Sequence, residues 1–139
     1  MLRASAIAAS KAMEPRFLTK IAAALVDQMW NLDSNERLAG ILGTCKLYDA
    51  NSPPASVVEA FKTLLLDDDF MVRSAAVHAC ARNGVQDAMP TIVGMWGEDP
   101  SASVRKTCED CLSKSKDPAV RGMLAARKRL QVELAALQS

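Results

Sequence analysis

The 139 residues carry a formal net charge of +1, half of them are hydrophobic, and only 4% are aromatic. A chain of this length fits a single domain. Its apolar content is mostly Ala, Leu, Val and Met, which favours helices and argues against the aromatic, β-branched strands of a β-sandwich. No apolar run approaches the roughly 20 residues that a membrane span needs. Composition therefore predicts one all-α domain.

The charges are unevenly spread along the chain. Residues 28–99 hold ten acids against five bases, whereas residues 105–129 hold eight bases against three acids. Such segregation predicts an acidic partner surface for the basic C-terminal third. The alternative is a normal solvated surface whose charges happen to be sorted this way.

Residues 1–14 form an N-terminal extension that resembles a mitochondrial import segment, because residues 1–13 include Arg3 and Lys11 and no acid. An additional N-terminal helix is the alternative. The four cysteines lie inside helical patterns and no secretory signal is visible, so we expect reduced thiols in an intracellular compartment. A mitochondrial location is the first expectation, and a cytosolic or cytoskeletal one is the second.

Apolar residues recur at spacings of three and four along most of the chain, which predicts helices. The expected helices cover residues 15–32, 34–47, 56–66, 71–82, 87–96, 101–115 and 118–138. Asp33 or Ser34 is expected to cap the second helix, Asp87 the fifth, and Gly84 is expected at the C-terminal end of the fourth. The breaks between helices are short and polar, and no strand pattern competes.

Three segments repeat one another when they are aligned on an arginine that follows each turn. Arg37, Arg73 and Arg105 recur at nearly even spacing, and small residues follow each of them. A helix pair that recurs every 30–40 residues or so is typical of a stacked α-solenoid. One such pair cannot bury its own apolar face, so neighbouring pairs must stack.

The repeated pattern is an apolar helix, an acidic turn, Val-Arg and then small residues. It is clearest in LLLDDD at residues 64–69 followed by Val72-Arg73, and in Met89-Pro90 followed by Asp99 and Val104-Arg105. This pattern resembles the HEAT repeats, including the HEAT-like repeats of phycobilisome lyases. The resemblance implies a short all-α solenoid within one domain, residues 1–139. Its parts are a weak repeat at 16–47, repeats at 56–84 and 87–115, and a capping helix at 118–138.

In HEAT repeats a turn aspartate and the following arginine support the stacking of successive repeats. Carried over to this chain, the resemblance implies a structural ladder in which Asp67 or Asp69 pairs with Arg73, and Asp99 pairs with Arg105. These residues would then serve the fold and not a ligand.

The polar clusters do not form a catalytic or metal site. Cys108-x-x-Cys111 lacks the further ligands that zinc requires, and both cysteines align with alanines at helix-packing positions. His78 is the only histidine, and no His-Glu dipeptide of the HEAT-like metal hydroxylases occurs. The aspartates at 67–69 lack the spacing of a calcium loop. We therefore expect no enzyme, no metal and no cofactor.

The most direct functional expectation is a scaffold subunit that binds other protein subunits of a larger assembly. The second helix of each pair is expected to present the partner-binding residues, and the basic last helix to add an acid-binding or lipid-binding surface. The expected contact residues are His78, Arg82, Lys106, Asp110, Lys114, Arg127, Lys128 and Arg129. Alternatives are a lyase-type or chaperone-type protein acting on a client subunit, and a nucleic-acid-binding subunit. The lack of aromatic side chains among the basic ones argues against base stacking.

Overall fold

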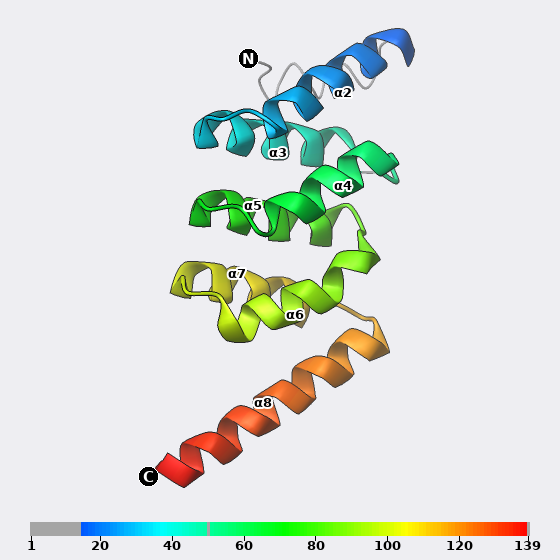
Figure 1. The fold of residues 1–139 in the computed structure, drawn as a ribbon. Coiled ribbons are helices and arrows are strands. Elements are labelled where there is room, and N and C mark those ends of the chain that lie inside the picture. The colour runs from blue at the N-terminus through cyan, green and yellow to red at the C-terminus, as the bar shows by residue number, and fades with distance from the viewer. Residues whose placement is uncertain (1–14, 50, 139) are drawn as a thin grey trace.

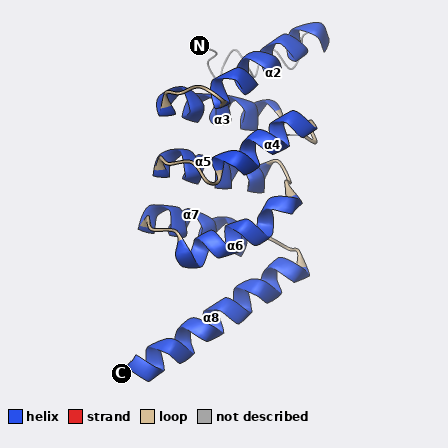
Figure 2. Cartoon of the chain, in the orientation of Figure 1, coloured by secondary structure: helices blue, strands red, loops and turns tan. Residues whose placement is uncertain are grey.

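The structure is a computed structural model that describes residues 15–49 and 51–138. Across this part of the chain it contains seven α-helices, one short 3-10 turn and no strand (Figures 1 and 2). The proposed import segment at residues 1–14 lies outside the described residues. Among the described helices, none is both long and apolar enough to cross a membrane.

The helices follow one another as antiparallel pairs that stack into an elongated array (Figure 1). The pairs are α2 (Pro15–Met29) with α3 (Ser34–Leu47), α4 (Ala55–Leu64) with α5 (Phe70–Arg82), and α6 (Met89–Glu98) with α7 (Ala102–Ser113). The 3-10 turn η1 (Gln86–Ala88) leads into α6, and α8 (Pro118–Gln138) closes the described chain. The chain is thus an all-α short solenoid, as the repeat pattern predicted.

The second helices of the pairs form one layer of the array. In it α5 packs against α3 on one side and against α7 on the other, while each first helix packs against its own second helix. A continuous core runs between the layers, with Ile41, Phe61, Val72, Ile92 and Val104 all fully buried. No single pair could bury these side chains alone, so the stack supplies the hydrophobic stabilisation.

Small residues allow the helices of this core to approach closely. Gly40, Ala76 and Cys108 each stand three residues after the repeated arginine, and all three are buried. A Cβ at Gly40 would lie 2.8 Å from the backbone nitrogen of Met29, so α3 touches the backbone of α2 at this point. The predicted packing role is confirmed for Ala76 and Cys108.

The helix ends show which sequence signals were correct. Asp33 and Asp69 accept hydrogen bonds from the backbone N–H groups two residues later and cap α3 and α5. Gly84 has a φ of 71°, and the next N–H bonds back to Cys80 O, a Schellman ending that favours glycine. The expected cap at Asp87 is wrong, because Asp87 lies inside η1 and α6 begins at Met89 without a side-chain cap.

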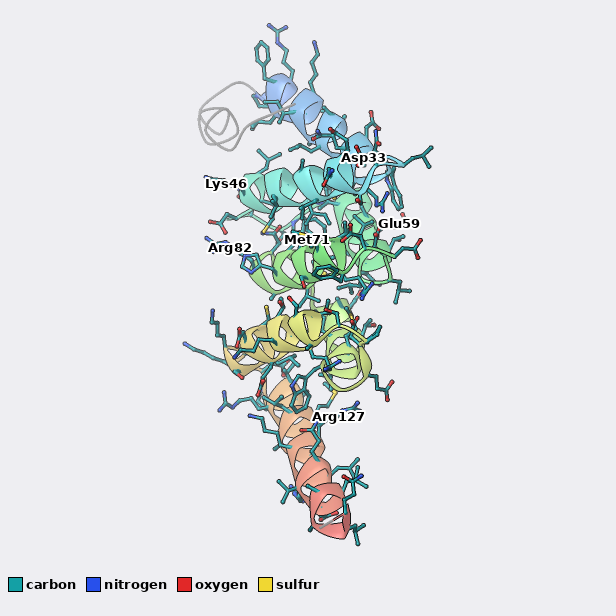
Figure 3. All side chains as sticks on the ribbon, turned by 90° about the vertical axis from the view of Figure 1, so that its left-hand side faces the viewer. Asp33, Lys46, Glu59, Met71, Arg82 and Arg127 are labelled. Atoms are coloured by element: carbon teal, nitrogen blue, oxygen red, sulfur yellow. The ribbon has the colours of Figure 1, made fainter. Side chains whose placement is uncertain are left out.

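The last helix, α8, is different from the others. Its beginning packs against α6 and α7 and buries Val120 and Leu124. Its remainder projects past the last helix pair in both ribbon views (Figures 1 and 3). This projection leaves several large apolar side chains exposed, including Leu130, Leu134 and Leu137.

Candidate interaction surfaces

Two arginines bind the turn of the following helix pair through paired hydrogen bonds. Arg37 donates from Nε to Asp67 Oδ2 at 2.7 Å and from Nη2 to Oδ1 at 3.0 Å. Arg73 makes the same two contacts with Asp99, at 3.0 and 3.1 Å. Such planar, two-point ion pairs fix geometry as well as energy. They join pair one to pair two and pair two to pair three.

Arg73 and Arg105 also hold the turns of their own pairs. Nη1 of Arg73 donates to the carbonyl oxygens of Asp67 and Asp68, at 2.9 and 3.1 Å. Nη1 of Arg105 donates to the carbonyl oxygen of Asp99 at 2.6 Å. The expected pairing within a repeat is therefore wrong for the carboxylates. Arg73 and Arg105 reach the aspartates of their own turns through backbone oxygens, and the carboxylates bind the arginine of the preceding pair.

The other two residues of the expected ladder, Asp69 and Arg105, take no part in the ion pairs between helix pairs of the described chain. Asp69 uses its Oδ1 to accept from the N–H of Met71 as a helix cap and is not the carboxylate that holds Arg73. Hydrogen bonding and charge at this cap lower the pKa of Asp69 below its usual value, the bond from Met71 being the largest cause. Arg105 has no carboxylate partner among the described residues. The ladder therefore ends at the third pair.

The ladder pairs are largely removed from water. The side chains of Arg73 and Asp99 are 14% and 5% exposed, and those of Arg37 and Asp67 are 17% and 7% exposed. Breaking a pair of this kind on one side leaves an uncompensated charge and costs about 3–5 kcal/mol. These residues consequently hold the array together and present little surface to a ligand.

An open groove lies across the layer of second helices, between α5 and the end of α7. Its volume is about 480 Å³. It brings Lys114, at the end of α7, close to His78 and Arg82 of α5, and all three are predicted contact residues. The other lining residues are Ala81, Gln86, Met89, Cys111, Ser115, Lys116 and Asp117. We call this the basic groove.

The other two predicted residues of this face are not part of the basic groove. Lys106 donates from Nζ to Asp110 Oδ1 at 3.0 Å within α7, and both side chains are more than half exposed. This bond is the first cause that raises the pKa of Lys106. Arg82 at the groove edge makes a paired contact with Asp49 of the first pair.

The three predicted contact residues of α8 have different surroundings. Arg127 turns back toward the third pair, where it lies 3.6 Å from Glu98 Oε1 and covers Gly97 (Figure 3). Lys128 lines a small groove between α7 and α8, and Arg129 is exposed. Arg127 therefore serves the docking of α8, while Lys128 and Arg129 face solvent.

The cysteines are packing residues. Cys45, Cys80 and Cys108 are buried in the core, Cys111 is half-buried, and all four are free thiols. Burial raises the pKa of Cys80 and of Cys108 to about 12. Thiols in this state are poor nucleophiles and poor metal ligands. Within the described residues, no cluster of three or more His, Cys, Asp or Glu side chains could hold a metal ion.

A second and larger groove is one that the sequence reasoning missed. It lies on the side of the first helices, between the α2–α3 turn and α4, and has a volume of about 1220 Å³. Its apolar lining includes Trp30, Leu32, Val58 and Leu66, and Leu32 is completely exposed. We call it the apolar groove. The sequence does contain a signal for this groove. Trp30 and Leu66 both stand seven residues before a ladder arginine, in turns that need no apolar side chain.

The profile of the HEAT repeats matches residues 22–113 and, in a second alignment, residues 58–132. The chain is a HEAT-repeat protein. No curated protein and no solved structure matches it significantly. HEAT repeats generally act as scaffolds for protein interaction and are typically non-enzymatic, so protein partners are the general expectation for this HEAT-repeat chain.

Proposed function

We propose that this HEAT-repeat protein is a non-enzymatic binding subunit of a larger assembly. The basic groove carries the proposal. It is an open surface built by two successive helix pairs, and it combines positive charge with apolar side chains. Enclosed, mostly apolar cavities are typical of small-molecule sites, whereas an open groove of mixed character fits a protein segment.

The chemistry of the basic groove fits an acidic segment that also carries an apolar side chain. Lys114 and Lys116 supply positive charge, Arg82 lines the edge while paired with Asp49, and Asp117 is the one carboxylate among the lining residues. Met89 and Cys111 supply an apolar floor. Methionine adapts its shape to different partners, which suits a binding surface. Complementary charge would speed the encounter and select the partner.

The proposed location is a mitochondrion. The support is the basic, acid-free composition of residues 1–13. Fusing residues 1–20 to a fluorescent protein tests this expectation directly. Co-localisation with a mitochondrial dye supports it, and a diffuse signal contradicts it. Replacing Arg3 and Lys11 by Glu in the same fusion provides the matched control.

The binding role is tested by size under native conditions. The tagged protein is extracted gently, separated by size-exclusion chromatography and analysed together with its companions by mass spectrometry. We expect elution far above the mass of a single chain, with companions in fixed proportion. Elution as a free monomer contradicts a permanent place in an assembly.

Two variants locate the binding surface. Lys114→Glu reverses a charge inside the basic groove, and Lys106→Glu reverses an exposed charge outside it, on α7. We expect Lys114→Glu to lose the companions and Lys106→Glu to keep them. Equal retention by both variants would exclude the basic groove as the binding surface.

A further inference from the structure

Most of the exposed large apolar side chains among the described residues gather in two regions. One is the apolar groove with its neighbouring turns, where Trp30 is 49% exposed and Leu66 is 75% exposed. The other is the projecting part of α8. Contiguous apolar surface on a protein of this size marks a place of contact. The two regions lie near opposite ends of the array (Figure 1), so within one molecule they do not cover each other.

The projecting part of α8 presents a regular stripe. Leu130, Leu134 and Leu137 are spaced by four and three residues, so they lie on one face of the helix, and each is at least half exposed. Arg129 and Glu133 flank the stripe on one side, whereas Lys128 lies on the opposite face of the helix. We call residues 128–138 the α8 arm. It is a helix that carries net positive charge and exposes its leucines on one face.

The apolar groove has the dimensions and charge to receive such a helix. It runs beside α4, whose 10 residues span about 15 Å, and the leucine stripe spans about 10 Å at about 1.5 Å per residue. Glu59 and Asp68 are exposed acids on its lining, and Lys62 is the exposed base. Glu59 lies on the same edge of the array as the α2–α3 turn, which Asp33 marks (Figure 3). Acids in the groove can meet Arg129, and Lys62 can meet Glu133.

We propose that the α8 arm of one copy binds in the apolar groove of a second copy, so that the protein associates head to tail. Each copy then offers one arm and one groove. A head-to-tail contact of this kind uses two different surfaces and leaves one of each free at the ends, so chains grow with concentration. The contact would bury the leucine stripe against Trp30, Leu32 and Leu66.

Simple end-on stacking of two copies is a weaker alternative. The ladder ends at Arg105, and continuing it would need a carboxylate in the first turn of the next copy. That turn has Asn31 at the position of Asp67 and Asp99, six residues before its arginine. Asn31 already accepts from the N–H of Asp33 at 2.8 Å, and its amide N–H₂ group would face further donors on Arg105. The first turn therefore cannot repeat the two-point ion pair.

The first test is the mass of the purified full chain by sedimentation velocity over a range of concentrations. We expect the average mass to rise from that of the monomer toward dimers and longer species with concentration. Added salt should lower the association, because exposed charges contribute. A mass that stays at the monomer value through about 100 μM, where a specific micromolar contact would be saturated, overturns the proposal.

Two variants then separate the arm from the groove. Leu134→Asp removes the arm's apolar contact, and Leu32→Asp places a charge in the groove; both positions are at least half exposed, so folding is preserved. Each variant alone should be monomeric, with a Kd raised about tenfold or more. Mixed in equal amounts, they should form a heterodimer and nothing larger, because one intact arm and one intact groove remain. Circular dichroism of each variant checks the fold.

The mixing experiment also excludes a symmetric contact between two α8 arms. That contact predicts that Leu32→Asp still dimerises alone and that mixing does not rescue Leu134→Asp, and either result overturns the proposal. A charge swap refines the register. Lys62→Glu and Glu133→Lys should each weaken association, and the variant carrying both should restore it. Failure of the double variant to regain affinity would refute the proposed contact between Lys62 and Glu133.

Discussion

Removing the carboxylate of Asp99 tests the idea that buried ladder pairs hold the solenoid together. Asp99 is 5% exposed at its side chain and accepts from Arg73 Nε and Nη2 and from the N–H of Ser101. Asp99→Ala leaves the guanidinium of Arg73 largely buried without its counter-charge. We expect a loss of about 3–5 kcal/mol in the free energy of unfolding, a large share of the total for a domain of this size.

The measurement is urea unfolding followed by circular dichroism and by tryptophan fluorescence. Asp110→Ala is the matched control, because it breaks the exposed Lys106–Asp110 pair and should cost only about 0–1 kcal/mol. Arg73→Met combined with Asp99→Leu should recover about half of the loss or more, since an apolar pair removes the stranded charge.

Two results would refute this reasoning. A cost below about 1 kcal/mol for Asp99→Ala would mean that water reaches the pair and screens it as on an open surface. A double variant that is less stable than Asp99→Ala alone would mean that the contacts from Arg73 to its own turn outweigh the ion pair. Either result would mean that hydrogen bonds other than the Arg73–Asp99 pair stabilise the stack.

Three further predictions test other parts of the stack. Asn83 is buried and donates from Nδ2 to two carbonyl oxygens at the end of the first pair, so Asn83→Ala should cost about 1–3 kcal/mol in urea unfolding by leaving those oxygens unpaired. Gly40→Ala should destabilise the chain because the new Cβ would meet the backbone of α2. Gly94→Ala is the matched control, since its Cβ meets nothing within 4 Å and the substitution should stabilise the chain by about 0.4–1 kcal/mol. Thermal unfolding compares the two variants, and equal shifts in Tm would contradict the close approach at Gly40. Burial raises the pKa of Cys80 from 9.0 to about 12. The stability that the neutral, buried thiol of Cys80 contributes is therefore complete below pH 9 and is lost as the pH rises toward 12. Iodoacetamide at pH 8 should label the half-buried Cys111 before the other cysteines. Peptide mapping by mass spectrometry checks this order.

Local chemistry in the sequence determined the helices and their ends. Helix period, the capping aspartates at 33 and 69 and the φ-permissive Gly84 act within a few residues of the chain, so they can be recognised without a tertiary structure. The spacing of the three arginines likewise predicted the stacked pairs. The failure at Asp87 is also local in origin, because a 3-10 turn and a helix start share the same polar signals.

The tertiary structure decided which side chains meet between pairs. From the sequence alone, Asp99 could bind either Arg105, six residues later, or Arg73 of the preceding pair. Only the stacking of the pairs brings Arg73 Nε within 3.0 Å of Asp99, which is distant from it in the sequence. The grooves have the same origin, since Trp30, Val58 and Leu66 come from separate elements and line one surface only after α2 and α4 pack. A surface made by elements distant in sequence depends on how the helices pack, and no local signal encodes that arrangement.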